Sequence, residues 1–592
     1  MKLMKNIYRY LFAASLAAVC HASYAQDLDP TVIVDRAYEG KLIEVHKPAL
    51  EMSVPDSLMR FDLDFDYSVF DRPYKGSYEF NPYLLSMKPS VASDRPGRLY
   101  VRAGAGYGLH PEADIVWSPA LSKKGNAFRM NVYAHHRSYV GDYHKIDRIL
   151  SDINSGPDVN NIVDRSGNRV WSGYDSRTEA GVDVGYDWAR GQLGLDASYR
   201  GLHQQDFRWV RGYNAMDLDF RAASKDGARF KYSLDAGYIA AVDNSSGTDG
   251  MYSRLNEQVL DLSAAVGSRF NDKDFVLEAD MSTALYSDLV DASATVVAVT
   301  PKYIYERGAL YASLGVRLDK AFYAEYFHVF QGLRKQQVIY PDVDVRLKLV
   351  PEYLSACLKL GGGSRLLSYS DIIERNPYFK AASVHDLYFL YPSGRCDMGV
   401  ETERISAVAG LEGRIGGSFG YDLYGGYVNY AAGMLDFMAF EAVYYSALRQ
   451  DFVPYEKLFA ALDMRWRSDR FAADASVVFN HVGGSAFDAS DPSKVFLYLA
   501  PAALEGDISL EYNYSRRIYA GIDCSFRTAR SNALDSIRIP GYVDLGLSAE
   551  YVTSRGLSFW ARGGNLLGMT IQRVPLYAEK GPYFTLGFSL KL

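Results

Sequence analysis

Histidine is the residue type in this chain best suited to metal binding or acid–base catalysis, and its ten copies are scattered. His135 and His136 are adjacent, so in a strand their side chains point to opposite faces and do not bind one ion together. His144 lies in "GDYHKIDRILSDI", a candidate short amphipathic helix on which a surface histidine is the simpler interpretation. Cys-x-x-Cys, His-Glu-x-x-His and glycine-rich phosphate motifs are all missing from the sequence. We therefore predict no metal site and no cofactor.

Charged residues that recur at every second position form a more informative set. The candidates are Asp196, Arg200, Asp217, Asp219, Arg221, Asp235, Asp523, Arg527 and Arg562. In strands, such residues share one face, and opposite charges on neighbouring strands can pair. Two interpretations stay open. The charges solvate a water-filled interior and pair across strands, or they dock another segment or line a solute path.

Aromatic residues gather in two long predicted loops, from about Tyr139 to Ser176 and from Gly363 to Glu403. The candidates for ligand contact are Tyr143, Trp171, Tyr174, Tyr378, Tyr388 and Tyr391. Long loops without regular structure are often functional, which makes these two the expected binding surface. The rings have the chemistry to stack on sugars, but they would equally well pack the loops together.

The elements that must position these residues are β-strands. "FKYSLDAGYIA" from Phe230 and "IYAGIDCSFR" from Ile518 alternate apolar with polar residues, which sorts the side chains onto two faces. The 47 Tyr and 50 Gly also favour strands and tight turns. No stretch is long and apolar enough for a membrane helix.

Two kinds of connection alternate along the chain, and together they predict an outer-membrane barrel. Tight polar turns such as "KDGAR", "IGGS" and "SRR" alternate with longer segments, which include two more predicted loops at 433–452 and 483–504. "KVFLYLAP" from Lys494 is assigned to the last of these loops. About 22 strands are expected, with starts near Leu99, Ala113, Ala127, Arg177, Gln192, Asn214, Phe230, Glu257, Phe275, Ala294, Leu310, Gln337, Tyr353, Arg404, Phe419, Tyr455, Phe471, Asp507, Ile518, Tyr542, Leu557 and Tyr583.

The predicted fold is all-β: a transmembrane antiparallel up-and-down barrel over residues 98–592. Strands of about 10–12 residues, a charged polar face and the lack of covering helices favour it over the alternative, a soluble sandwich or propeller. A sheet crosses a bilayer only if it closes on itself. The final "YFTLGFSLKL" is the expected closing strand, with Phe584, Leu586, Phe588 and Leu590 facing lipid and Ser589 facing the lumen.

The first 25 residues have the pattern of a cleaved signal peptide, with basic residues before an apolar run and Ser23-Tyr24-Ala25 before the cleavage point. The mature chain is expected to begin near Gln26. A lipidated Cys20 is the rival interpretation, and Val19 before it fits poorly. The three later cysteines can form at most one disulfide.

Residues 26–97 alternate poorly and contain prolines, charges and aromatics. We expect an ordered but irregular segment in the periplasm or docked in the lumen. A flexible linker is the alternative, although the aromatic content is high for a disordered tail.

The closing strand and "ARGGNLLG" (561–568) resemble the end of TonB-dependent receptors. "RLYVRAGAGYGLHPEADIVW" looks like the first strand of receptor-like barrels of Bacteroidota type that lack a full plug. The resemblance implies an outer-membrane receptor or transporter. "LIEVHKPA" is only partly similar to a plug tract, and residues 26–97 are too few for a full plug. "TVIVDR" (31–36) is a candidate TonB box, a short segment that pairs with TonB as a strand.

Three functions follow as expectations: a receptor-like transporter for an unidentified ligand, a scaffold or accessory barrel of a barrel-insertion or lipoprotein-export assembly, or an outer-membrane enzyme. The last is disfavoured, because nothing marks a catalytic group among the histidines near predicted rims or loops, namely His110, His328, His385 and His481. Expected partners are outer-membrane lipids, the barrel-assembly machinery that reads a terminal strand, and TonB or a surface lipoprotein. A net charge of −7 argues against nucleic acid.

Overall fold

The computed structural model describes residues 98–592 apart from internal stretches, the longest of which are 145–169, 324–337 and 380–397. The predicted signal peptide, the predicted segment 26–97 with its candidate TonB box, and the predicted loop residues Tyr388 and Tyr391 lie outside the described residues.

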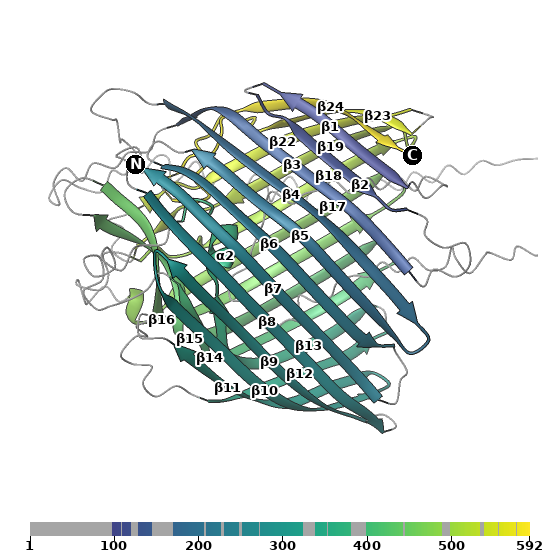
Figure 1. Cartoon of the computed structure of the whole chain (residues 1–592). Helices are drawn as coiled ribbons and strands as arrows, with labels where there is room; N and C mark the ends of the chain where they lie inside the picture. Colours follow the sequence, from purple (N-terminus) through teal and green to yellow (C-terminus); the bar gives the residue numbers. More distant parts are fainter. Residues whose placement is uncertain are drawn as a thin grey trace, which may run out of the picture. The chain divides into compact units, whose positions relative to one another are not determined.

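In the described residues, 22 strands form one antiparallel sheet, which closes because β1 pairs with both β2 and β24 (Figure 1). The strands are β1 (Leu99–Gly106), β2 (Glu112–Trp117), β3 (Phe128–His144), β4 (Val170–Trp188), β5 (Gly191–Gln205), β6 (Trp209–Ser224), β7 (Phe230–Gly247), β8 (Tyr252–Phe270), β9 (Lys273–Asp288), β10 (Ala292–Arg307), β11 (Leu310–Tyr323), β12 (Ile339–Val350), β13 (Leu354–Leu367), β14 (Gly399–Ile415), β15 (Phe419–Glu441), β16 (Tyr445–Arg467), β17 (Phe471–Gly483), β18 (Leu504–Tyr514), β19 (Ile518–Arg527), β22 (Tyr542–Val552), β23 (Leu557–Gly564) and β24 (Tyr583–Lys591). A separate hairpin joins β20 (Arg530–Ser531) to β21 (Arg538–Ile539). The predicted barrel and its strand number are confirmed.

The two ends of the barrel differ in their connections. The end with short turns also holds the C-terminus (Figure 1). At this end Ser515 and Arg516 both have φ of 55°, as a two-residue hairpin turn requires, and Arg517 N–H donates to the Tyr514 carbonyl at 3.1 Å. The opposite end, called the long-loop end below, carries the connections that follow β3, β13, β17 and β23.

The outer surface of the barrel is apolar, and the two faces of β24 show the division. Phe584, Leu586 and Phe588 are 53%, 57% and 44% exposed, whereas Thr585 and Ser589, which alternate with them, are buried on the inner side. Exposed aromatic side chains also mark the short-turn ends of many strands: Trp117, Tyr186, Phe230, Phe275, Tyr353, Trp466, Phe471, Tyr514, Tyr551 and Phe559. An apolar band edged by aromatic rings is the surface that a membrane barrel presents to lipid.

Several strands are longer than predicted at the long-loop end. β4 begins at Val170 instead of near Arg177, and β16 begins at Tyr445 instead of near Tyr455. The predicted loop 433–452 is mostly a hairpin, because β15 and β16 stay paired from Gly433↔Val453 onward after a register shift. Residues 141–144, assigned to a candidate helix with His144, belong to β3. Cross-strand pairing overrode the local signals in each case.

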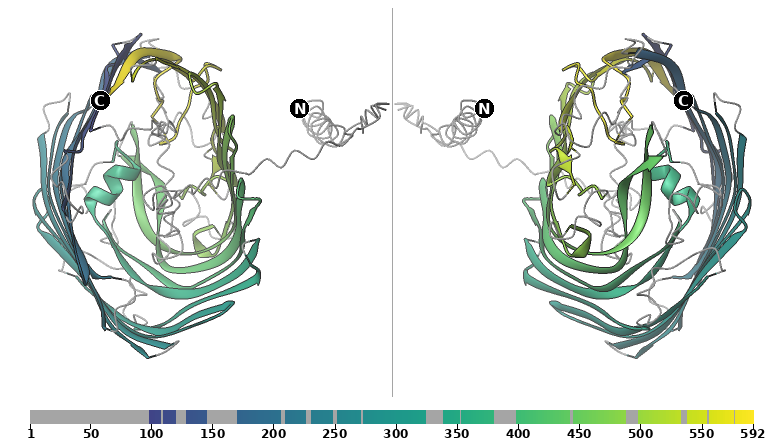
Figure 2. Two further views of the ribbon diagram at one scale, coloured as in Figure 1. Left: turned by 90° about the vertical axis from the view of Figure 1, so that its right-hand side faces the viewer. Right: turned by 90° about the vertical axis from the view of Figure 1, so that its left-hand side faces the viewer.

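The α-helix α2 (Tyr369–Arg375) lies inside the ring of strands, where it is the short teal helix in the end-on views (Figure 2). In the part of the chain that the structure describes, no helix is long and apolar enough to span a membrane. "KVFLYLAP" was predicted to lie in a loop, and its described part, from Tyr498 onward, indeed belongs to no strand.

Candidate functional site

The chain turns into the lumen after β13, instead of leaving the barrel. β13 has a register shift between Gly361 and Gly363, and Gly363 has φ of +134°. A side chain at Gly363 would lie 2.7 Å from Arg317 and 2.9 Å from Asp319, so the close approach requires glycine. Asp319 accepts hydrogen bonds from the backbone N–H and the hydroxyl of Ser364. These contacts fix the inward course of residues 368–379, which we call the lumen insert.

α2 begins with its N–H groups satisfied by carboxylates. Ser368 and Asp371 form a capping box, with Asp371 N–H donating to Ser368 Oγ at 3.1 Å and Ser368 N–H to Asp371 Oδ2 at 3.0 Å. Glu257 of β8 accepts from the backbone N–H groups of Tyr369 and Ser370 at 2.6 and 3.0 Å. A buried carboxylate at a helix start satisfies donors that have no partner within the helix. Glu257 thereby ties the helix to the wall.

A second contact set holds the far end of the lumen insert. The Arg211 guanidinium of β6 donates to the carbonyls of Pro377 and Phe379, and it lies 3.3 Å from Asp243 of β7. The Arg211 and Asp243 side chains are only 2% and 6% exposed. Tyr369 donates its hydroxyl to Asp243, and burial raises the pKa of Tyr369 well above its ordinary value. The phenol therefore stays protonated and able to donate.

Apolar packing completes the attachment of the lumen insert. Ile372, Ile373 and Phe379 are at most 5% exposed. They belong to one buried cluster with inner-wall residues Leu202, Leu255, Val259, Ala284, Ala292, Ala294 and Val296. Full burial of each large side chain contributes about 1.5–3 kcal/mol. The lumen insert is thus part of the folded core of the barrel.

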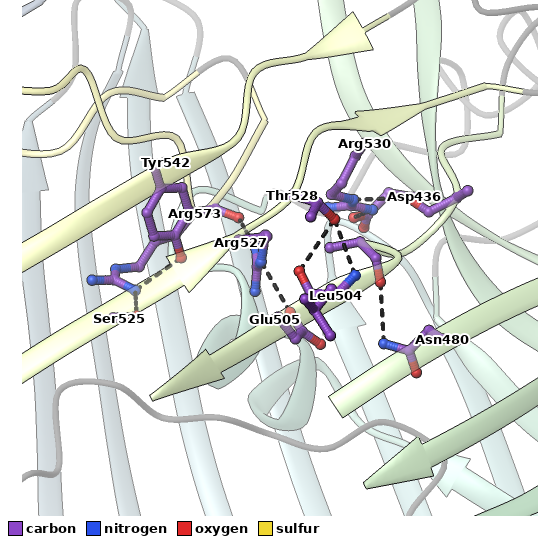
Figure 3. Close-up of polar contacts among 12 residues, drawn as sticks. Asp436, Asn480, Leu504, Glu505, Ser525, Arg527, Thr528, Arg530, Tyr542 and Arg573 are labelled. Atoms are coloured by element: carbon purple, nitrogen blue, oxygen red, sulfur yellow. Dashed lines mark hydrogen bonds and ion pairs between the residues drawn. The ribbon is translucent and has the colours of Figure 1, made fainter. Parts of the chain in front are cut away.

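The connection between β23 and β24 (565–582) has its own charged anchor. Arg573 donates to Tyr542 Oη at 3.0 Å and Ser525 Oγ at 3.2 Å (Figure 3). It also pairs with Asp544 at 2.8 Å and with Glu579 at 2.9 Å. The guanidinium therefore joins its own loop to β19 and β22.

Neighbouring arginines extend this network along the long-loop end (Figure 3). Arg527 pairs with Glu505 at 3.0 Å and donates to the Arg573 carbonyl at 3.1 Å. Arg530 pairs with Asp436 at 2.8 Å and donates to the carbonyl of Ala500 at 3.0 Å. Planar guanidinium groups suit such contacts with several oxygens.

The two connections meet through stacked tyrosines. Tyr378 of the lumen insert and Tyr577 of the β23–β24 connection have ring centroids 4.0 Å apart and planes 8° apart. Burial raises the pKa of Tyr378 well above its ordinary value. Residues from two distant parts of the chain are thereby joined at the long-loop end.

A buried histidine and lysine hold the other end of the β23–β24 connection. Lys580 Nζ lies 2.7 Å from His110 Nε2 and 3.7 Å from the centre of the Tyr583 ring. Burial lowers the pKa of His110 to about 3, with Lys580 adding to the effect, and burial lowers the pKa of Lys580 to about 8. At neutral pH a neutral imidazole accepts a hydrogen bond from the ammonium group, which also makes a cation–π contact.

The predicted contact aromatics are only partly in loops. Tyr143 lies at the end of β3 and Trp171 at the start of β4, and their ring centroids are 4.6 Å apart. Tyr174 also lies in β4. Tyr143 is 5% exposed. Tyr378 stacks on Tyr577, as described above. Tyr143, Trp171 and Tyr378 therefore each stack on another ring of the protein. Contact of the predicted aromatics with a ligand stays a prediction.

The nine predicted lumen charges share the strand face opposite the exposed apolar residues, such as Leu195, Leu218 and Ile522. Arg200 pairs with Asp217 at 2.5 Å and lies 3.8 Å from Glu374 of α2, which places that face toward the lumen.

The other predicted charges differ in their partners. Asp196 lies in register with Asp219, and Arg221 is 3.9 Å from Asp235. Asp523 accepts a hydrogen bond from Ser509 Oγ at 2.8 Å. Arg527 pairs with Glu505, and Arg562 is in register with Ser548 and Thr585. A solute-binding role for these charges stays a prediction.

Sequence reasoning missed the main anchors, Arg211, Asp243 and Glu257, because no sequence motif links them to the lumen insert. A weak signal was available: Arg211 shares the alternation of Asp217 and Asp219, but the predicted strand began at Asn214. The lumen insert, which these residues contact, was predicted only as part of a long loop.

The histidines do not gather. His135 Nδ1 is 2.9 Å from Asp114, and His136 Nδ1 is 2.9 Å from the Thr178 hydroxyl. His481 lies in β17, and His328 and His385 are outside the described residues. Among the residues that the structure describes, no group of three or more His, Cys, Asp or Glu is arranged to hold a metal ion.

No protein-family model matches this chain, and no curated protein matches it. Solved structures with a similar fold include the copper transporter OprC, with 14% identity over 84% of this chain and 81% of that chain and a TM-score of 0.57. The siderophore receptor PirA from Acinetobacter baumannii has 9% identity over 83% of this chain and 80% of its own, with a TM-score of 0.55. A third similar structure is the Serratia marcescens hemophore receptor HasR in complex with hemophore HasA and heme. It has 14% identity over 83% of this chain and 80% of its own, with a TM-score of 0.55. These neighbours are TonB-dependent receptors, and this chain shares their barrel fold.

Proposed function

We propose that this protein is an outer-membrane receptor-like transporter that captures its ligand at the long-loop end. The observation that carries the proposal is the closed barrel with an apolar outer band and a charged lumen. The similar structures are a copper transporter, a siderophore receptor and a hemophore receptor, which supports transport over catalysis.

The finer parts of the proposal come from the sequence. Residues 1–25 are a cleaved signal peptide, residues 26–97 are a periplasmic or lumen-docked segment, and the chain is a barrel of Bacteroidota type that lacks a full plug. Residues 31–36 pair with TonB as an added strand. The barrel-assembly machinery reads β24, and TonB or a surface lipoprotein is the further partner.

Purification of the intact membrane complex tests this function. Co-purification of TonB, lost on a Val32→Pro substitution that removes one backbone donor, supports energised import. A matched Val34→Ala substitution should retain it. Absence of TonB from the wild-type complex under conditions where a known receptor retains it would contradict coupled import.

A scaffold or accessory barrel is the second candidate. It is favoured by one observation: connections folded into the long-loop end occupy part of the lumen, as expected of a barrel that does not conduct (Figure 2). Recovery of the barrel-insertion or lipoprotein-export machinery at stoichiometric levels would favour this candidate over transport.

A further inference from the structure

We propose that the lumen insert is a built-in gate, whose release from the inner wall opens a path through the barrel. The inference rests on the proposed membrane function, and it concerns a connection between two barrel strands. Residues 368–379 leave β13 and attach to β5, β6, β7 and β8 on another part of the wall. The insert thus lies within the lumen and reaches beyond the strands that carry it.

The wall presents a matched polar socket for this insert. Glu257 accepts hydrogen bonds from two backbone N–H groups at the start of α2, and Arg211 donates to two backbone carbonyls that follow the end of α2. Tyr213 donates its hydroxyl to Ser370 at 2.8 Å. The socket therefore contacts both ends of the insert with groups of the required polarity. Water can replace each of these contacts once the insert leaves, so release exposes no polar group to an apolar solvent.

The connection between β23 and β24 also holds the insert. Gln204 donates to the Pro377 carbonyl at 2.5 Å, and the next residue, Tyr378, stacks on Tyr577. The β23–β24 connection that carries Tyr577 is anchored by Arg573 and Lys580. A ligand that displaced Tyr577 at the long-loop end would remove one of the two holds on the insert. The geometry therefore couples capture at the mouth to opening of the lumen.

The test measures docking and permeation separately. In a full-length variant without Cys357, Cys396 and Cys524, Ile373→Cys places a thiol on the buried side of α2, where the native side chain is 5% exposed. A membrane-impermeant maleimide should label it at least tenfold more slowly than Tyr252→Cys, whose native side chain is 67% exposed. Adding Glu257→Ala should raise the Ile373→Cys rate at least tenfold, whereas adding Asp219→Asn should leave it unchanged.

Permeation is then compared in the same variants, through single-channel conductance in planar bilayers. We expect Glu257→Ala to raise open probability at least fivefold over wild type. Tyr577→Ala, which leaves the wall socket intact, provides a second route to release if Glu257→Ala yields no heat-modifiable barrel. Rapid labelling of Ile373→Cys in the otherwise native protein would overturn docking. Increased labelling with unchanged conductance in both release variants would overturn the gate. Either outcome leaves TonB co-purification, and so the proposed receptor function, unaffected.

Discussion

Tyr378 and Tyr577 stack at 4.0 Å although one follows α2 and the other lies between β23 and β24. The contact makes the position of the lumen insert depend on a connection from another part of the barrel. Because Tyr378 is followed directly by buried Phe379, a disturbance of the stack is transmitted to the attachment on the wall.

Tyr577→Ala should therefore loosen the lumen insert without unfolding the barrel. An aromatic pair contributes about 0.5–1.5 kcal/mol beyond its buried area, so amides at 378–379 should exchange about 2–12-fold faster. Hydrogen exchange with mass spectrometry measures this change. Tyr252→Ala, at an exposed site, is the control, and equal protection in both variants would contradict the coupling.

Arg211→Ala should destabilise the protein more than Arg211→Ala combined with Asp243→Ala. Removing one member of a buried pair costs about 3–5 kcal/mol, since the remaining charge is left without its partner. The double substitution removes both charges, although Tyr369 then loses an acceptor. Thermal unfolding in detergent should show that the double variant loses much less stability than the sum of the losses in the two single variants. Simple additivity would show that the two groups do not interact energetically.

Acid should weaken the attachment of the β23–β24 connection through His110. Its pKa is about 3 in the folded protein, below the ordinary value of 6.5, so the unfolded state binds more protons between these values. The contribution of neutral His110 to the free energy of unfolding is fully present above about pH 6.5. It is lost as the pH falls toward 3, by up to about 1.4 kcal/mol per pH unit. Melting temperatures from pH 4 to 7 measure the slope, which His110→Gln should reduce. An identical slope in this variant would assign the acid sensitivity to other groups.

The outer band predicts which substitutions prevent membrane insertion. Leu218 is 48% exposed on the outside of β6, while Asp219 is its lumen-facing neighbour. Leu218→Arg should cost about 2–4 kcal/mol if it lies near the bilayer midplane and should lower the outer-membrane level of heat-modifiable barrel. Asp219→Asn should not. Equal levels of both variants would contradict the assignment of the two faces.

Strand existence was predictable from the sequence because alternation is a local signal. Leu99, Phe230, Leu310, Phe419 and Tyr583 were each predicted as strand starts and are the first residues of their strands. The long-loop ends were less predictable, since pairing beyond the alternating segments depends on the neighbouring strand.

The lumen insert was not predictable for a related reason. Its anchors, Arg211, Asp243 and Glu257, contact residues far along the chain, and such contacts leave no periodic pattern. Arg200 and Asp217 were each predicted on the polar face, because alternation along a strand is a local pattern, and the structure pairs them across β5 and β6.

Closure of the barrel should be sensitive to a side chain at Gly587. At this position β24 pairs with β1, and the Trp560 ring lies across the glycine. A Cβ atom would come within 2.2 Å of the Ala103 carbonyl oxygen and 2.3 Å of the Trp560 ring, so the closing strands would have to shift. Gly587→Ala should therefore reduce the heat-modifiable form on unheated gels. Gly581→Ala is the matched control, because a Cβ atom there meets nothing within 4 Å. Normal closure of the Gly587→Ala barrel would show that the seam between β1 and β24 is wider than described.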